Sequence, residues 1–220
     1  MDWPLLESLS DAERRDVLAT ARLRRFARSE VVCHQGDPSD SLHLVARGRL
    51  AVRTSTPAGD SVTLNLLSPG SFFGELSLLR KEAPSKRTAT VVALEDAATH
   101  SLPAASFRRL CDTYPRVEQL LTALLARRVE ELSERLLEAL YVGLDRRVYR
   151  RLLELCELYA TGAEAVTIPL TQEQLADLVG GTRPSVNQIL QKLANQGLAS
   201  LGRGRIVVPD RAALLRRAGL

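Results

Sequence analysis

The sequence predicts an α+β chain with an N-terminal β-sandwich or barrel, one long helix and a C-terminal helical domain that ends in a hairpin. Three observations support this fold class. Short alternating segments separated by Gly, Pro, Asp and Ser fill the first half. A helical pattern of apolar residues then begins at Pro115 and runs to about Val142. Finally, two short helical patterns flank the glycine pair Gly180 and Gly181.

Composition limits the possible classes of protein. A chain of 220 residues with 45% hydrophobic residues can form one large or two small domains with buried cores. No run of about 18 apolar residues occurs, and the first residues, MDWPLLESLSDAERR, are acidic and polar, unlike a signal peptide. We therefore expect a cytoplasmic protein that does not engage a membrane.

The three cysteines, Cys33, Cys111 and Cys156, lie far apart and form no CxxC pair. This spacing favours neither a disulfide framework nor a zinc or iron–sulfur site. We expect all three to be small buried hydrophobic side chains.

The net charge of +4 mildly favours an anionic partner. The position of the charge is more informative, because arginines gather in the C-terminal third, which we assign to DNA. Solvated helix faces would explain some of them without a ligand. These arginines are Arg146, Arg147, Arg150, Arg151, Arg203, Arg205, Arg211, Arg216 and Arg217.

Residues 5–21 have helical spacing, and Ser10 with Glu13 resembles a capping box, so a short N-terminal helix is predicted. From Arg24 the period changes to that of strands. The predicted strands are residues 31–34, 41–45, 49–54, 62–66, 89–93 and 97–102, with turns at Gly36, Gly48, Gly59 and Gly70.

Residues 73–91, FGELSLLRKEAPSKRTATV, have a spacing suited to a small anionic ligand. Gly74 permits close approach of the backbone, and the Glu75 carboxylate can accept hydrogen bonds from sugar hydroxyls. The planar Arg87 fork matches phosphate oxygens, and Thr88 could complete a nest around the charge. Together they suit a ribose-phosphate. The alternative is a surface ion pair between Glu75 and Arg87.

The three histidines, His34, His43 and His100, fall in the predicted strands, where a cupin-like metalloenzyme would place its ligands. They are isolated, however, whereas such sites use two histidines one residue apart and a nearby carboxylate. A metal site is therefore the less favoured alternative. No arrangement of nucleophile, base and orienting group indicates an enzyme.

The long helix has two apolar faces, which require two partners. One face could pack on the β domain and the other on a second copy as a parallel coiled coil, although a buried helix in a monomer remains an alternative. Gly143, after the helix, could be a hinge or a helix C-cap. The two stripes are Leu121, Leu125, Leu132 and Ala139, and Val117, Leu120 and Leu124.

Residues 171–198 have the clearest local pattern. Thr171 and Gln174 form a capping box, the two glycines form a turn, and Thr182 caps a second helix that runs to about Asn195. This arrangement predicts a helix-turn-helix, whose second helix enters the DNA major groove. Arg183 lies on its first turn, and arginine reads guanine bidentately. Residues 198–208 predict a wing hairpin.

The GEL…RTAT pattern, preceded by HQGDPSDSLHLVARGRLAVR, resembles the catabolite activator (cyclic-AMP receptor, CRP/FNR) family of bacterial transcription regulators. The resemblance covers nearly the whole chain. It implies a jelly-roll cyclic-nucleotide-binding domain over residues 1–113, a dimerisation helix and hinge over 114–143, and a winged helix-turn-helix domain over 144–220. The implied effector is cyclic AMP, with cyclic GMP or no effector as alternatives. No metal cofactor is expected.

The resemblance also implies a set of pocket residues. Arg128 matches a family arginine that pairs with the pocket glutamate. Leu132 and Ser133 stand where the family has two hydroxyl residues that bind the adenine amino group, and Leu132 cannot do so. The loop at residues 80–86 is longer and more basic than expected. The full set is Gly74, Glu75, Leu76, Arg87, Thr88, Arg128, Leu132 and Ser133.

In the recognition helix, family members often carry Arg-Glu-Thr-Val where this chain has Arg-Pro-Ser-Val. Pro184 replaces a glutamate that would accept a hydrogen bond from cytosine, so the operator should differ from the best-known operator of the family. The resemblance implies a homodimer on a pseudo-palindromic operator, with RNA polymerase as a further partner and the effector as allosteric control. A regulator with a vestigial or differently liganded pocket that binds DNA constitutively is the alternative. The expected DNA contacts are Thr171, Gln172, Thr182, Arg183, Pro184, Ser185, Asn187, Gln188, Lys192, Arg203 and Arg205.

Overall fold

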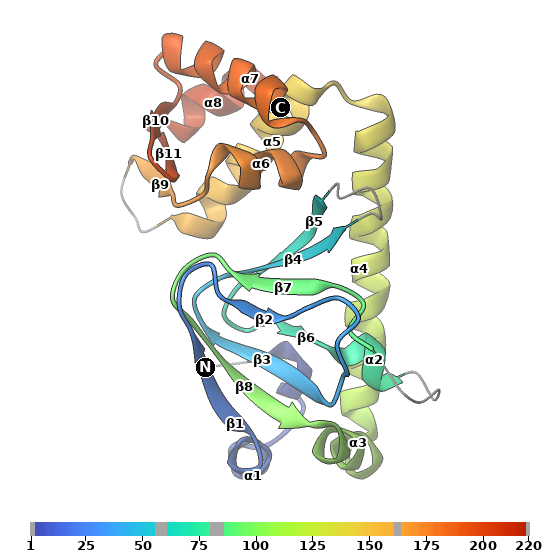
Figure 1. Cartoon of the computed structure of the whole chain (residues 1–220). Helices are drawn as coiled ribbons and strands as arrows, with labels where there is room; N and C mark the ends of the chain where they lie inside the picture. Colours follow the sequence, from blue (N-terminus) through green and yellow to red (C-terminus); the bar gives the residue numbers. More distant parts are fainter. Residues whose placement is uncertain (1–2, 56–60, 80–85, 161–163, 219–220) are drawn as a thin grey trace. The chain divides into compact units, whose positions relative to one another are not determined.

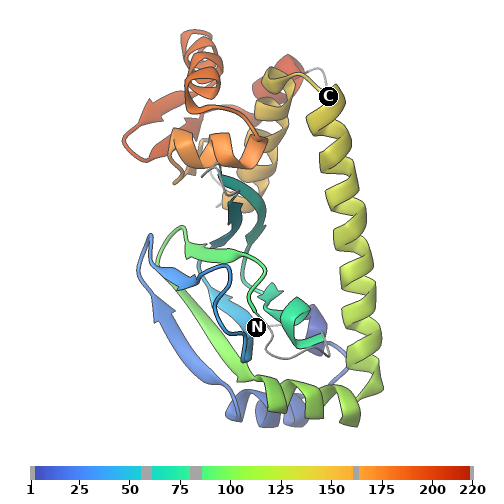
Figure 2. The same ribbon diagram turned by 45° about the vertical axis from the view of Figure 1, so that its right-hand side comes forward.

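The computed structural model describes residues 3–55, 61–79, 86–160 and 164–218 (Figure 1). The chain divides into two compact units, residues 1–130 and 131–220. Helix α4, Pro115–Tyr141, is one continuous helix that contributes residues to both units (Figure 2).

The first unit is built on two four-stranded antiparallel sheets, with strand orders β1-β8-β3-β6 and β2-β7-β4-β5. Figure 1 shows the two sheets facing each other as layers of a jelly roll. The core between them includes Phe26, Val45, Leu50, Phe73 and Val91. The strands are β1 Arg22–Phe26, β2 Val31–Cys33, β3 Ser41–Arg47, β4 Leu50–Ser55, β5 Ser61–Leu67, β6 Phe72–Phe73, β7 Thr90–Ala93 and β8 Ala97–Pro103.

All six predicted strands are confirmed, with ends that differ by no more than two residues. Within the described part of the first unit, β1 and β6 were missed, and β9, Val166–Ile168, was missed in the second unit. β1 has the sequence RLRRF, and four of its five residues are exposed, so no apolar alternation marks it. β6 has only two residues. Gly59, one of the predicted turn glycines, lies outside the described residues.

The predicted short N-terminal helix is present, but it does not extend over all of the helical spacing at residues 5–21. The structure has a 3₁₀ helix η1, Pro4–Leu6, followed by α1, Asp11–Ala19. The capping box is confirmed, since the Ser10 hydroxyl accepts from the Glu13 N–H and the Glu13 carboxylate accepts from the Ser10 N–H at 2.7 Å. The extended backbone that this cap requires at Ser10 separates the two helices.

The N-terminal segment is anchored on the jelly roll. Trp3 is buried and donates from its indole N–H to the Val45 carbonyl at 3.0 Å. Its ring also meets the His100 ring edge-on, with centroids 5.6 Å apart. Trp3 therefore belongs to the core of the first unit.

Helices α2, Glu75–Leu79, and α3, Ala104–Thr113, complete the first unit together with the beginning of α4. Val117 and Leu121 of α4 are buried in a second core with Leu42 and Phe107. One apolar face of α4 thus packs on the jelly roll, as predicted. Further along α4, Val129 and Leu136 are exposed, as are Leu132, Leu137, Leu140 and Tyr141.

The second unit contains a helix-turn-helix and a three-stranded sheet in the order β10-β11-β9, which confirms the predicted winged helix-turn-helix. Its core includes Val148, Leu152, Leu175 and Leu190. Its elements after α4 are α5 Leu144–Tyr159, β9 Val166–Ile168, α6 Gln172–Val179, α7 Arg183–Asn195, β10 Ser200–Gly202, β11 Arg205–Val208 and α8 Arg211–Ala218.

Two smaller expectations were tested by the backbone and by burial. Gly143 is the N-cap of α5 with φ −56° and ψ 149°, so it does not have the left-handed conformation of a glycine C-cap. Cys156 is buried as expected, but Cys33 and Cys111 are only half-buried. The expectation of full burial is therefore wrong for these two cysteines, which lie at the edges of the hydrophobic cores.

Candidate functional site

A cavity in the first unit is lined by residues from the end of β6, from α2, from the segment before β7 and from α4. The structure thus brings together predicted pocket residues that are far apart in the sequence. Those that line the cavity are Gly74, Glu75, Leu76, Arg87, Thr88 and Arg128, together with Cys33, Val52, Phe73, Ser77, Ala89 and Val91.

Glu75 is the first residue of α2 and is only 2% exposed. Its Oε1 accepts a hydrogen bond from Arg128 Nη1 at 3.1 Å, whereas Oε2 has no partner among the described residues. Burial raises the pKa of Glu75, and the charge of Arg128 opposes this shift. A buried acceptor without a donor is suited to a ligand hydroxyl.

Arg87 supplies the opposite charge and is 6% exposed. Its Nη2 donates to Ser41 Oγ at 3.0 Å, and its Nη1 has no partner within the described part of the chain. The Asp40 carboxylate is 4.0 Å from Nη2, but its side chain is largely exposed. The alternative of a surface ion pair between Glu75 and Arg87 is wrong, because both are buried and each has a different partner.

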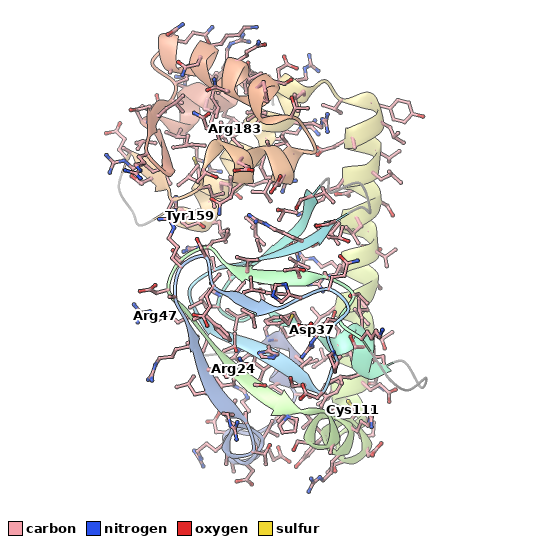
Figure 3. The ribbon with its side chains drawn as sticks, in the orientation of Figure 1. Arg24, Asp37, Arg47, Cys111, Tyr159 and Arg183 are labelled. Atoms are coloured by element: carbon pink, nitrogen blue, oxygen red, sulfur yellow. The ribbon has the colours of Figure 1, made fainter. Side chains whose placement is uncertain are left out.

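The backbone of Arg87 is fixed by the turn after β2. The Arg87 N–H donates to the Asp37 carbonyl at 2.8 Å, and the Gly36 N–H donates to the Arg87 carbonyl at 2.9 Å. Asp37 is labelled in Figure 3. Ser77 of α2 adds a hydrogen bond to the Lys86 carbonyl at 3.0 Å. The HQGD segment and α2 therefore hold the arginine where it meets the cavity.

Gly74 is required by the space around Arg87. Its φ is +94°, and a Cβ added there would lie 2.2 Å from Arg87 Nη1 and 2.8 Å from the Ser41 carbonyl oxygen. Only glycine fits such a position. Thr88 is exposed at the lining of the same cavity.

The remaining predicted pocket residues are placed less directly. Leu132 and Ser133 are exposed on α4 and belong to the second unit, so their part in ligand binding stays a prediction. Residues 80–85 of the loop at 80–86 lie outside the described residues, so the expectation that this longer, more basic loop alters access to the pocket or attracts a differently charged phosphodiester stays a prediction as well.

The helix-turn-helix is assembled by the predicted caps. Thr171 Oγ1 accepts from the Gln174 N–H at 3.1 Å, and Gln174 Oε1 accepts from the Thr171 N–H at 2.8 Å. Gly180 ends α6 in the left-handed conformation, with φ 63°. Thr182 caps α7 by accepting from the Ser185 N–H, so that α7 begins at Arg183. The predicted local structure is confirmed.

One face of α7 is buried through Val186, Leu190 and Leu193, which leaves the opposite face to solvent. Gln191 is also exposed on this helix, three residues after Gln188. Arg183, labelled in Figure 3, is the first residue of this helix. The predicted contacts that are exposed or half-buried in this unit are Thr171, Gln172, Thr182, Arg183, Pro184, Ser185, Asn187, Gln188, Lys192, Arg203 and Arg205.

Several of the C-terminal arginines make contacts within the unit. Arg147 donates to the Val179 carbonyl at 2.6 Å, and Arg150 pairs with Glu138 of α4. These arginines join helices, so the arginine-rich composition alone overstates the charge that is free for DNA. Further pairs are Arg151 with Glu154, Arg211 with Glu157, Arg216 with Asp210, and Arg217 with Gln196 and the Tyr149 ring.

The described helices include none that is long and apolar enough to cross a membrane. Within the described ranges, no three His, Cys, Asp or Glu side chains form a group that could hold a metal ion. His43 is buried between Ser41 and Thr99, to which its ring nitrogens are hydrogen-bonded.

Comparison with known proteins places these features in a family. Residues 23–114 match the cyclic nucleotide-binding domain, and residues 146–217 match the Crp-like helix-turn-helix domain. The CRP-like cAMP-activated global transcriptional regulator of Mycobacterium tuberculosis is 30% identical over 88% of this chain and 86% of that protein. The cyclic AMP receptor protein of Thermus thermophilus is 32% identical over 96% of this chain and 94% of that protein. The chain is a member of the CRP/FNR family.

Solved structures agree with this membership. The catabolite activator protein of Thermus thermophilus is 31% identical over 98% of both chains, with a TM-score of 0.55. The c-di-GMP responsive regulator CLP of Xanthomonas campestris, at 20% identity, has a TM-score of 0.78 over 90% of this chain and 99% of that one. This second likeness supports the fold alone.

As a CRP/FNR protein, the chain is a transcription regulator with a cyclic nucleotide-binding domain and a DNA-binding helix-turn-helix. Its relatives are transcription regulators and not enzymes, which removes the cupin-like metalloenzyme alternative.

Sequence reasoning also missed a contact of Arg87 and two exposed apolar residues of α4. Ser41 contacts Arg87 from 46 residues away, and no local pattern could have indicated this pairing. Val129 and Leu136 extend the exposed apolar residues of α4, and the heptad spacing around Leu125 and Leu132 could have revealed them.

Proposed function

We propose that this CRP/FNR regulator binds a cyclic nucleotide in the cavity of its first unit and that the nucleotide controls DNA binding by a homodimer. The observation that carries the proposal is a pair of buried atoms without partners among the described residues, Arg87 Nη1 and Glu75 Oε2, beside one cavity. The first requires an anion and the second a hydroxyl donor, and a sugar-phosphate supplies both.

Cyclic AMP is the first candidate, because the names of the M. tuberculosis and E. coli relatives describe cAMP-activated regulators. The adenine-binding segment departs from the family, since Leu132 lacks the hydrogen-bonding group that Ser133 retains. Loss of one hydrogen bond costs about 0.5–1.5 kcal/mol. Cyclic GMP therefore stays a second candidate for the effector.

The homodimer is supported by the exposed apolar residues of α4. Val129, Leu132, Leu136 and Leu140 follow one another at steps of three and four, as in the seam of a coiled coil. A monomer would leave this apolar stripe in water. A parallel pair of α4 helices would bury it and would let two α7 helices enter successive major grooves, ~34 Å apart, on a pseudo-palindromic operator.

Control by the effector would act through Arg128. This residue lies on α4 and pairs with Glu75, so a ligand hydroxyl that binds the same carboxylate alters a contact of the dimerisation helix. Such coupling requires that the nucleotide has different affinities for two states of the dimer. RNA polymerase remains the expected further partner of a transcription regulator.

Isothermal titration with cyclic AMP and cyclic GMP tests the proposal. We expect heat of binding with at least one nucleotide and its loss in Arg87→Ala. Arg47→Ala is the matched control, because Arg47 is exposed at the end of β3 and does not line the cavity. If neither nucleotide binds to the wild-type protein, the sensing proposal fails, while the DNA-binding function remains.

The alternative is a regulator whose pocket has another ligand or none, a reading favoured by Leu132 in place of a hydrogen-bonding residue. Operator binding measured by fluorescence anisotropy with and without nucleotide separates the two. Equal affinity in both conditions would favour constitutive binding, and mass spectrometry of the purified protein would identify a ligand that remains bound.

A further inference from the structure

We propose that Ser41 and His43 are positioning residues of the anion site, which hold the Arg87 guanidinium so that one nitrogen faces the ligand. This inference rests on the proposed function and names residues outside the predicted pocket set. Its basis is a buried hydrogen-bonded chain from Arg87 through Ser41 and His43 to Thr99.

Ser41 is the inner contact of the arginine. It opens β3 and is 8% exposed. Its Oγ accepts from Arg87 Nη2 at 3.0 Å, lies 2.9 Å from Asp40 Oδ1 and lies 3.3 Å from His43 Nε2. A hydroxyl has one proton and two lone pairs, so these three contacts use its full capacity. The Ser41 oxygen therefore has a defined position and direction.

His43 holds the Ser41 hydroxyl through a hydrogen bond and is itself held by Thr99. It is 1% exposed, and its Nδ1 lies 3.0 Å from Oγ1 of the buried Thr99 on β8. Its ring stacks on Phe73 with centroids 4.7 Å apart. Because the Ser41 hydroxyl donates its one proton to Asp40, the neutral ring carries its proton on Nε2, which donates to Ser41, and Nδ1 accepts from the Thr99 hydroxyl. Burial, with Arg87 and Arg24 nearby, lowers the pKa of His43 to about 3, which keeps the ring neutral beside Arg87.

The consequence for Arg87 is an asymmetric fork. Nη2 is held by Ser41, whereas Nη1, beside Gly74, has no partner in the described part of the structure. An arginine that is already held loses less conformational freedom when it binds an anion, and its second nitrogen stays available for a phosphate oxygen. Phe73 stacks on His43, lines the cavity and immediately precedes Gly74 in the chain. The histidine is therefore also in contact with the segment that borders Arg87.

The test combines affinity and coupling. Titration uses whichever of cyclic AMP and cyclic GMP binds the wild-type protein. We expect Ser41→Ala to weaken binding about tenfold, because a hydrogen bond to a charged group is lost, and Ser41→Thr to retain most of the affinity. His43→Phe keeps an aromatic ring on Phe73 and should weaken binding several-fold. Thr63→Val, which removes a buried hydroxyl from the other sheet, is the matched control and should bind like the wild type.

A double-mutant cycle separates positioning from general damage to the fold. In an Arg87→Lys background, which keeps the charge but not the fork that Ser41 holds, Ser41→Ala should have little further effect on nucleotide affinity, whereas independent effects would multiply. Wild-type affinity in Ser41→Ala, or an unchanged effect in that background, would overturn the inference.

The same cycle measured by urea unfolding without nucleotide makes the test independent of the effector. Coupling between Ser41 and Arg87 in this measurement supports the positioning role of Ser41 even when neither nucleotide binds. Failure of both nucleotides to bind would count only against the proposed function. If the effects of the two substitutions on the unfolding midpoint were additive, Ser41 would not position Arg87, whatever the ligand.

Discussion

Arg147 on α5 donates through Nη1 to the carbonyl oxygen of Val179 at 2.6 Å, at the C-terminal end of α6. The same nitrogen lies 3.5 Å from the Gly180 carbonyl oxygen. The carbonyl groups at the end of a helix lack partners within the helix and carry partial negative charge, so a guanidinium satisfies both requirements. Arg147 thus closes the first helix of the helix-turn-helix just before its turn.

Replacement of this arginine should destabilise the second unit. We expect Arg147→Ala to lower the free energy of unfolding by about 1–2 kcal/mol, from the lost hydrogen bond and helix-end charge. Urea denaturation measures this change. Arg146→Ala is the matched control, since it removes the same charge from the neighbouring, exposed position. Equal destabilisation by the two variants would show that the contact contributes nothing.

A second prediction concerns the glycine beside Arg87. Gly74 and Gly36 have nearly the same positive φ, +94° and +92°, but a Cβ at Gly36 would meet nothing within 4 Å. Gly36→Ala should therefore cost only the strain of a left-handed residue, about 1–2 kcal/mol. Gly74→Ala should cost more in thermal unfolding and should also abolish nucleotide binding in titration, because the new methyl displaces the Arg87 guanidinium. Nucleotide binding by Gly74→Ala with wild-type affinity would contradict this account.

The proposed dimer seam predicts a change of mass. Leu136 is 60% exposed on α4 in the single chain, and a charge placed in a coiled-coil seam opposes pairing. Leu136→Glu should therefore shift the protein from dimer to monomer in analytical ultracentrifugation. Leu215→Glu, at an exposed leucine of α8, is the control and should remain dimeric. A dimer that tolerates Leu136→Glu would locate the interface elsewhere.

Two buried groups predict opposite dependences of stability on pH. The pKa of His43 falls from 6.5 to about 3 on folding, so the unfolded chain binds the proton first and stability falls as pH drops from about 6.5 toward 3. The pKa of Glu75 is raised above 4.5 in the folded protein. Its contribution to the free energy of unfolding is therefore full below pH 4.5 and is lost as the pH rises through the pKa of the folded state. Urea unfolding across pH 4–8 should show a shallower acid slope in His43→Phe, and Glu75→Gln should remove the opposite component. An unchanged acid slope in His43→Phe would contradict the first assignment.

The helix-turn-helix predicts two kinds of DNA contact. Arg183→Ala should cost about 1–3 kcal/mol on the preferred operator and relax its sequence preference, because arginine reads guanine in the major groove. Lys192→Ala should weaken binding to all sequences alike and reduce the salt dependence by about one phosphate contact. Anisotropy titrations over a range of salt on specific and random duplexes distinguish these patterns. If both variants behaved alike, α7 would not have the assumed orientation in the groove.

Local patterns in the sequence predicted much of the fold. The strands were visible from alternation and turn residues, and α4, α6 and α7 from their caps and periodicity. β1 was missed because charged residues dominate it, although it pairs with β8 along all five residues. The N-terminal helix was predicted too long because the cap at Ser10 was recognised but not used as the start of the helix.

The candidate site was only partly predictable. Gly74, Glu75 and Arg87 followed from residue chemistry and from the family resemblance. Ser41 and His43 did not, because a hydrogen bond between β3 and a loop 46 residues later depends on how the jelly roll closes. Arg147 has the same origin, since its carbonyl partner lies 32 residues away.

Trp3 is the sole tryptophan of the chain and lies in the core of the first unit. Its intrinsic fluorescence is therefore a label for that unit alone, whereas far-ultraviolet circular dichroism registers the helices of both. Recording the two signals in one heating experiment would reveal whether the units melt together or separately, without any dye or engineered reporter.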